Sequence, residues 1–294
     1  MATVNCGPCP PATKKRKRIS QITPHKKTND PTELWTELQT HDGRRCEPVA
    51  PMPLDTPILA DAIRFVCISD THSRLEQITH KLPPGDVLIH AGDFTQIGGR
   101  HEVEQFNCTL ARLPYARRLV IAGNHELSFD AATRRKSHDH NGGAKRHPQL
   151  LLTNCTYLQD NSAEIYGCKI YGSPWQPAFR GWAFNVARGQ PLLDKWNLIP
   201  DDTDVLITHG PPLGHGDRLY NGERAGCAEL LATVEQRVQP LLHVFGHIHE
   251  AYGVTTNHAG TTFVNASICD IGYRTKNLPV IFDVPLKPGY TKAK

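Results

Sequence analysis

The stretch RFVCISDTH (residues 64–72) joins a short apolar run to an Asp and a His that can bind a metal ion. Its apolar part has the composition of a strand that is buried on both faces of a sheet. Four further runs, each bounded by Gly, Asp or Pro, repeat this pattern: VLIHA (87–91), RLVIA (118–122), DVLIT (204–208) and LHVFG (242–246). We therefore expect a sheet whose strands end in polar loops.

Between these runs lie segments with the periodicity of helices and of hairpins. HEVEQFNCTLARL (101–113) and CAELLATVEQRV (227–238) place apolar residues at helical intervals, as helices that cover a sheet do. EIYGCKIYG (164–172) and YGVTTNHAG (252–260) with TTFVNAS (261–267) have the pattern of hairpins. The chain is therefore predicted to have a mixed α/β fold with stacked sheets.

Each of the five predicted strands runs into residues that can bind a metal ion. In chain order these are Asp70, His72, Asp93, Asn124, His209, His247 and His249. Binding sites of α/β sheets lie at the carboxyl ends of strands, where the loops converge. A single His at a strand end usually has a structural role, but five such ends in order are hard to produce by chance. We expect these side chains to meet at one edge of a sheet.

The residue types indicate a site for two divalent cations. The two Asp residues offer carboxylate oxygen, Asn124 offers an amide oxygen, and the His residues offer imidazole nitrogen. This donor set, which contains no thiolate, suits Mn²⁺, our first expectation, or Fe, Zn²⁺, Ni²⁺ or Mg²⁺. Seven ligands are too many for one ion, whereas two ions that share a carboxylate suit phosphoryl displacement. His90, at the end of a predicted buried strand, is expected to support the ligands rather than to join them.

Five ordered blocks carry a resemblance to a known family: DTH (70–72), GDF (92–94), GNHE (123–126), THG (208–210) and GHIH (246–249). They resemble the calcineurin-like metallophosphoesterase superfamily. The connecting text, such as IAGNHELSFD (121–130) and HVFGHIHEAYG (243–253), is similar to the animal metallophosphoesterase-domain-containing phosphodiesterases, over roughly residues 63–285. The resemblance implies an α/β fold, a four-layer αββα sandwich of two mixed sheets flanked by helices, with the dimetal site at the carboxyl ends of strands.

The resemblance also implies a role for each matching residue. The first metal ion would be held by Asp70, His72, Asp93 and His249, and the second by Asp93, Asn124, His209 and His247, with Asp93 as the bridge. His125 matches an active-site His of the family that is not a ligand. We therefore expect Asp93 and His125 to be catalytic, and Asn124 and His125 to contact the substrate.

The function that these expectations favour is hydrolysis of small or nucleotide-like phosphoesters, above all phosphodiesters. Two divalent ions lower the pKa of a bridging water from 15.7 toward about 7, so that hydroxide can attack phosphorus at neutral pH. GDF continues into Thr95-Gln96, not into the sequence of the protein-phosphatase branch, which disfavours protein dephosphorylation. Trp175, Trp182 and Phe184 are candidates for a stacking platform for a nucleobase.

Two other functions remain open from the sequence. One is a nucleotide- or metal-binding regulatory protein whose catalysis is incidental, and the other is a nuclease that uses a basic tail. Residues 1–30 carry seven Lys and Arg side chains against one Asp, including KKRKR (14–18), while the rest of the chain is nearly neutral. Nucleic-acid binding is therefore not expected, except loosely through this tail.

Composition divides the chain near residue 62. Prolines 48, 51, 53 and 57 disfavour helices and central strands. We expect a basic, Pro-rich, partly disordered tail (1–62) with one short helix around PTELWTELQ (31–39), followed by a metallophosphoesterase domain (63–294). The polar stretch AATRRKSHDHNGGAKRHPQ (131–149) is expected to be a long surface loop.

The location of the protein is predicted from the absence of membrane and secretion signals. No run approaches the ~18 apolar residues of a membrane span. The charged N-terminus lacks the apolar region of a secretory signal, and nine scattered cysteines fit a reducing compartment. We expect a cytoplasmic protein with no membrane partner, which is also nuclear if KKRKR directs import. The sequence predicts no oligomeric state.

Overall fold

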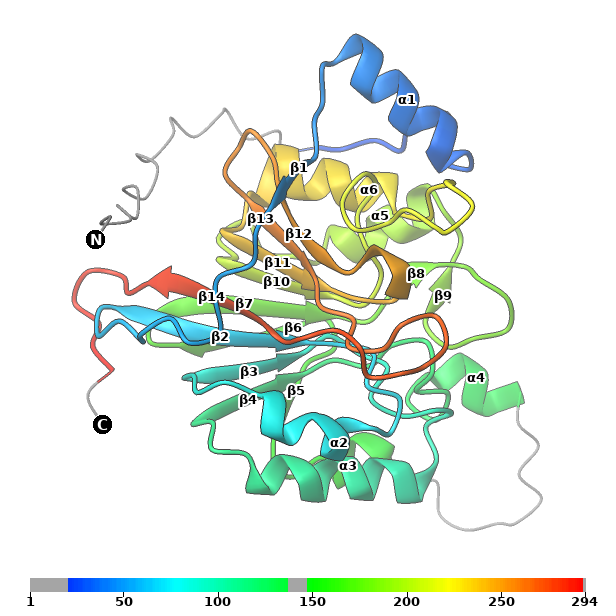
Figure 1. Ribbon diagram of the computed structural model, residues 1–294. Coiled ribbons are helices and arrows are strands. Elements are labelled where there is room, and N and C mark those ends of the chain that lie inside the picture. The colour runs from blue at the N-terminus through cyan, green and yellow to red at the C-terminus, as the bar shows by residue number, and fades with distance from the viewer. Residues whose placement is uncertain (1–20, 137–146, 293–294) are drawn as a thin grey trace.

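The computed structural model describes residues 21–136 and 147–292, and two β-sheets facing each other form its centre (Figure 1). The strands of the five-stranded sheet are, in spatial order, β14 (Val280–Pro285), β2 (Ala62–Ile68), β3 (Val87–His90), β4 (Arg117–Val120) and β5 (Thr156–Tyr157). β2 to β5 are parallel, and β14 is antiparallel to β2.

The seven-stranded sheet mixes both strand directions. Its spatial order is β1 (Glu47–Val49), β12 (Gly253–Thr256), β13 (Thr262–Asn265), β11 (Leu242–Phe245), β10 (Val205–Thr208), β7 (Cys168–Ser173) and β6 (Asn161–Ile165). The two hairpins expected from the sequence are present as the antiparallel pairs β6–β7 and β12–β13. A short parallel pair, β8 (Gln176–Pro177) and β9 (Asn185–Val186), forms a sheet of its own.

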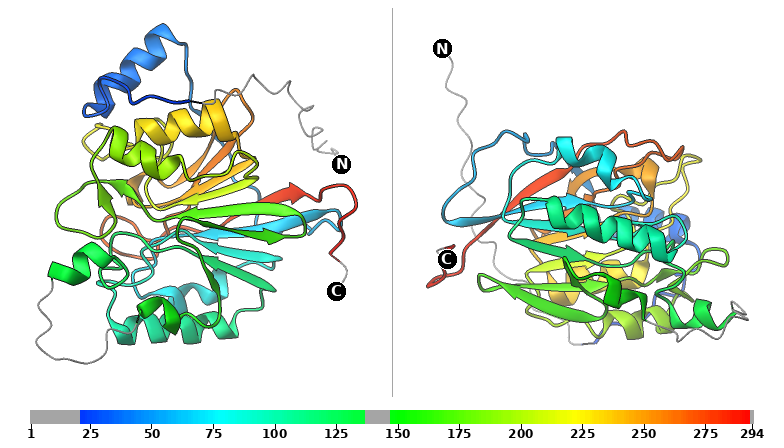
Figure 2. Two further views of the ribbon diagram at one scale, coloured as in Figure 1. Left: turned by 180° about the vertical axis from the view of Figure 1, so that it is seen from behind. Right: turned by 90° about the horizontal axis from the view of Figure 1, so that it is seen from below.

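Helices cover the outer face of each sheet (Figures 1 and 2). α2 (Leu75–Ile78) and α3 (Arg100–Arg112) pack on the five-stranded sheet. α5 (Gln190–Trp196) and α6 (Ala228–Ala232), which continues as the π-helical segment η3 (Thr233–Val238), pack on the seven-stranded sheet. The described residues also include three short 3₁₀ turns: η1 (Thr79–Lys81), η2 (Pro148–Leu151) and η4 (His249–Ala251). The expected four-layer αββα sandwich is confirmed.

The alternation of side chains along β2 explains why its apolar run is continuous. Phe65 and Cys67 point into the core between the two sheets, where they meet residues such as Ile207 of β10. Val66 and Ile68 point the other way, into the layer of α2 and α3. A strand whose two faces are both covered needs apolar residues at most positions, as the sequence predicted, and the one charged residue of β2, Arg64, is buried in an ion pair with Asp283.

Part of the proposed N-terminal tail belongs to this architecture. α1 (Pro31–His41) begins after Asp30, whose carboxylate accepts a hydrogen bond from the backbone N–H of Glu33 at 2.9 Å, so the predicted helix is present. Trp35 is buried against Gly214, and β1 pairs with β12 at the edge of the sheet, where Pro48 is tolerated. An extended tail is therefore the wrong description of residues 31–49. The division at residue 62 stays a prediction, and KKRKR lies outside the described residues.

The stretch expected as a loop over 131–149 is helical at its start. α4 (Ala131–Lys136) follows Asp130, whose carboxylate accepts hydrogen bonds from the backbone N–H of Ala132 and the hydroxyl of Thr133 at 2.9 and 2.8 Å. The loop expectation is thus wrong over these six residues because Asp130 caps a helix there, and residues 137–146 are outside the description. Among the helices that are described, none combines the length and apolar character needed to cross a membrane.

Candidate metal centre

Five strand ends from the two facing sheets bring the candidate ligands together. In the five-stranded sheet, β2 leads into Asp70 and His72, β3 into Asp93 and β4 into Asn124. In the seven-stranded sheet, β10 leads into His209, and β11 into His247 and His249. The expectation of a single sheet edge is therefore wrong. The site lies between two edges, because the parallel strands of both sheets direct their carboxyl ends to the same side of the sandwich.

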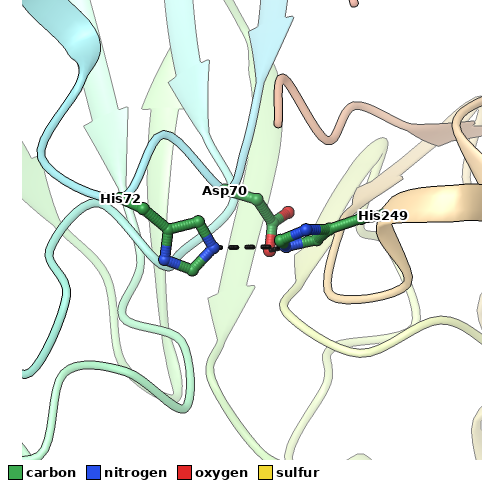
Figure 3. Close-up of side chains that lie close together, drawn as sticks. All are labelled: Asp70, His72 and His249. Carbon is green, nitrogen blue, oxygen red and sulfur yellow. Dashed lines mark hydrogen bonds and ion pairs between the residues drawn. The ribbon is translucent and has the colours of Figure 1, made fainter. Parts of the chain in front are cut away.

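Asp70, His72 and His249 form the first group of candidate ligands (Figure 3). Nε2 of His249 lies 3.3 Å from Oδ1 of Asp70 and 3.2 Å from Nε2 of His72. Two imidazole nitrogens this close together repel each other unless a proton or a cation lies between them. The group therefore fits a bound cation, with one oxygen and two nitrogen donors converging.

Asp93, His209 and His247 form the second group, and Asn124 lies within it. Nε2 of His209 is 3.3 Å from Oδ2 of Asp93 and 2.9 Å from Oδ1 of Asn124. Nδ1 of His247 is 2.7 Å from the same oxygen of Asn124. Oδ2 of Asp93 is also 4.0 Å from Nε2 of His72, so this carboxylate lies between the two groups.

Backbone carbonyls orient two of the imidazole rings. Nδ1 of His209 donates to the carbonyl of Ala91 at 2.9 Å, and Nδ1 of His249 donates to that of Asp270 at 3.0 Å. Because a carbonyl oxygen accepts a hydrogen bond and cannot donate one, each Nδ1 carries the proton and each Nε2 faces the centre. This arrangement is typical of metal-binding His residues.

The charges of the two Asp residues are partnered by imidazolium in the metal-free protein. Burial acts to lower the pKa of His209, but the carboxylate of Asp93 outweighs it and raises that pKa to about 9. Burial also acts to lower the pKa of His249, but the hydrogen bond to Asp70 outweighs burial and raises this pKa to about 9. The pKa of Asp93 is lowered, since nearby His charge outweighs burial. Burial lowers the pKa values of His72 and His247 to about 4 and 3.

Four of the candidate ligands have left-handed backbone conformations. The φ angles of Asp70, His72, Asp93 and His247 are 50°, 42°, 54° and 70°. Such angles are uncommon for residues other than Gly and cluster at functional sites, where the surrounding structure enforces them. Gly246, which precedes His247, cannot be replaced by a larger residue without strain, because a side chain there would collide with the carboxylate of Asp70.

The family comparison agrees with this geometry. The model of the calcineurin-like phosphoesterase family matches residues 63–251, which include all seven candidate ligands. The chain belongs to this family. The domain is therefore that of a phosphoester hydrolase. Calcineurin-like phosphoesterases typically bind two divalent metal ions, and the two groups described above provide a candidate site for each.

Several relatives of this phosphoesterase are similar over most of its length. Metallophosphoesterase domain-containing protein 1 of Homo sapiens is 50% identical over 274 residues, which cover 88% of this chain and 83% of the human protein. Two proteins of Caenorhabditis elegans match similarly. UPF0046 protein C25E10.12 is 50% identical, covering 90% of this chain and 96% of its own. UPF0046 protein T07D4.2 is 48% identical, and the match covers 93% of this chain and 72% of the relative.

His125 lies beside the candidate ligands of the phosphoesterase domain with its ring held on two sides. Nδ1 donates to the carbonyl of Gln96 at 2.6 Å, and the ring stacks on Trp182 with 4.2 Å between centroids. Nε2 is 4.0 Å from Oδ2 of Asp93. The free nitrogen of His125 therefore faces the region between the two groups.

The stacking platform expected from three aromatic residues is not formed. Phe184 is buried in the core, and Nε1 of Trp175 donates to Asp160 at 2.7 Å. The ring of Trp182 stacks on His125. This correction follows from packing, because the fold uses two of the three rings to fill its interior. His90 is buried with Nε2 2.8 Å from the hydroxyl of Thr71, so it supports a ligand-bearing loop, as predicted.

Some residues at the site were missed by the sequence analysis. Tyr273, with φ of 59°, places its ring 4.7 Å from that of His72. The hydroxyl of Ser267 donates to Oδ2 of Asp70 at 2.9 Å. Neither residue lies in a motif, so no local signal could have found them. Glu126, by contrast, belongs to the quoted GNHE block and was given no role.

Proposed function

We propose that this protein is a dimetal phosphodiesterase that hydrolyses small or nucleotide-like phosphoesters. The observation that carries the proposal is the position of Asp93 between the two groups of candidate ligands, with His125 beside it. The first ion would be held by Asp70, His72, Asp93 and His249, and the second by Asp93, Asn124, His209 and His247. Mn²⁺ is the first choice among ions that accept mixed oxygen and nitrogen donors.

When bound, two divalent ions supply a hydroxide nucleophile at neutral pH and offset the charge that develops on the phosphate. The protein's part is to hold the ligands in place. Oδ1 of Asp93 accepts a hydrogen bond from the backbone N–H of His125 at 2.8 Å. This contact leaves Oδ2 of Asp93 directed at the imidazoles of His72 and His209.

His125 is the proposed general acid. Because Nδ1 donates to the carbonyl of Gln96, Nε2 is the atom that can give a proton to the leaving oxygen. Asn124 is the proposed second contact to the substrate. Its Oδ1 faces two imidazoles, so its amide nitrogen remains to donate to a phosphate oxygen.

The test is turnover of bis-p-nitrophenyl phosphate by protein stripped of metal and then reloaded with Mn²⁺. We expect hydrolysis that depends on the metal. Thermal stabilisation by mononucleotides without turnover of any phosphoester would contradict the proposal and favour the regulatory alternative.

The role of His125 has its own test. His125→Ala is expected to lower turnover by roughly 10²-fold or more for diesters with poor leaving groups, and less for p-nitrophenolate, which needs little protonation. His101→Ala, which alters an exposed His on α3, serves as the matched control. Equal losses for both kinds of leaving group would contradict general-acid catalysis.

A further inference from the structure

Glu126 joins two loops that carry candidate ligands. Its side chain is fully buried and accepts four hydrogen bonds. Oε2 accepts from the backbone N–H groups of Asp93 and Gly123 at 2.9 and 2.6 Å. Oε1 accepts from the backbone N–H and the hydroxyl of Thr95 at 2.9 and 2.8 Å. One carboxylate thereby connects the loop after β3 with the loop after β4.

These bonds act on the residue that most needs support. Asp93 has a left-handed backbone, and such a conformation persists where the surrounding contacts enforce it. The bond from its N–H to Glu126 fixes the backbone, while the bond from the N–H of His125 to Oδ1 fixes the side chain. Gly123 completes this arrangement, since a side chain there would collide with the carboxylate of Asp93.

A second glutamate holds the other end of the same loop and provides a contrast. Glu102 of α3 accepts from the backbone N–H groups of Gln96 and Gly99 at 2.7 and 2.8 Å, and from the hydroxyl of Ser73 at 2.8 Å. Its bonds reach the part of the loop that supports His125 and the hydroxyl of Ser73 beside His72, but not the backbone of Asp93. Of the two glutamates, only Glu126 therefore holds the backbone of Asp93.

We propose that Glu126 is a positioning residue of the metal centre. By accepting from Asp93, Thr95 and Gly123, it sets the carboxylate of Asp93 where two ions can share it. Glu126 is not itself placed as a ligand, because both of its oxygens are taken up by N–H and O–H donors. This inference rests on the proposed dimetal site but not on the identity of the substrate.

The test compares Co²⁺ binding by the wild type and by Glu126→Gln, followed by the visible absorption of the bound ion. The Gln side chain has nearly the same shape, but its amide nitrogen cannot accept, so one pair of donors loses its partner. We expect Co²⁺ affinity to fall ten- to a hundredfold and the spectrum to change, as for other residues that support metal ligands. Glu229→Gln is the matched control, because Glu229 is equally buried but lies on α6. It should leave both readouts unchanged.

The outcomes separate this inference from the proposed function. Wild-type protein that binds two Co²⁺ ions but hydrolyses no phosphoester would contradict the function and leave the role of Glu126 intact. Wild-type affinity and spectrum in Glu126→Gln would overturn the role of Glu126, whatever the activity.

If Glu126→Gln does not fold, Thr95 decides the question. Thr95→Ala removes one of the four hydrogen bonds to Glu126 and should weaken Co²⁺ binding several-fold, whereas Thr95→Ser keeps the hydroxyl and should restore it. Unchanged binding in Thr95→Ala would then overturn the proposal.

Discussion

The two sheets contribute different chemistry to the metal centre. The five-stranded sheet supplies every candidate oxygen ligand, with Asp70, Asp93 and Asn124 following three neighbouring parallel strands. The seven-stranded sheet supplies imidazoles, from His209, His247 and His249. The group of Asp70, His72 and His249 and the group of Asp93, His209 and His247 each take members from both sheets, whereas a third convergent set, His72, Asp93 and His125, follows the five-stranded sheet alone. The two proposed ion sites therefore depend on the packing of one sheet against the other.

The largest effect is expected where the two groups meet. Asp93→Ala removes the oxygen that both ions would share, so turnover should fall on the order of 10³-fold or more. Phosphodiester hydrolysis and far-UV circular dichroism measure the loss and check that the fold is retained. Full activity at saturating Mn²⁺ would show that Asp93 is not shared.

A smaller effect is expected on the imidazole side. His247→Ala removes a candidate ligand of the second group and leaves the first group, Asp70, His72 and His249, complete. Metal analysis should find one ion per chain in place of two, with turnover reduced by roughly 10²-fold. If two ions are still bound, His247 is not a ligand and the division between the groups is wrong.

Glu102→Gln is expected to act on catalysis more than on metal binding. It removes an acceptor from the backbone of Gln96, whose carbonyl holds His125. Turnover of diesters with poor leaving groups should fall by about tenfold, the low end for a supporting residue. Co²⁺ affinity should fall less than in Glu126→Gln, because Glu102 holds Ser73 beside His72 but not the backbone of Asp93, and an equal fall would remove the contrast between the two glutamates.

The smallest effect concerns the stability of the metal-free protein. The pKa values of His209 and His249 are about 9 in the folded protein, against an ordinary 6.5. Raised pKa values favour the protonated folded form, so their stabilisation is present below pH 6.5 and is lost as the pH rises to 9.

The melting temperature of chelator-treated protein should therefore fall by several degrees across this interval, and less with Mn²⁺ bound. Scanning fluorimetry measures the change, and a rise with pH would contradict these ion pairs.

The predictable and unpredictable parts of the site differ in their physical origin. A strand buried on both faces, such as β2, needs a continuous apolar run, so the five strands and the residues that follow them could be predicted. The division of these strands between two sheets could not be predicted, because an apolar run indicates a buried strand but carries no information about which strands pair with it.

The geometry around the ligands was also hidden in the sequence. The left-handed backbone of Asp93 depends on Glu126 and Gly123, which come from a different loop. β1 has exposed residues and includes Pro48, so its place in a sheet follows from its pairing with β12 and not from its own pattern.

The edge strand β1 has a consequence for the order in which the protein is synthesised. Glu47 pairs with Thr256, so the ribosome makes β1 long before its partner exists. Pairing between such distant segments is slow to form, and an edge strand without its neighbour can associate with other chains. Nascent chains that stop before β12 should therefore be targets for chaperones. A chain from which β1 has been deleted would instead expose β12 as the edge of the sheet.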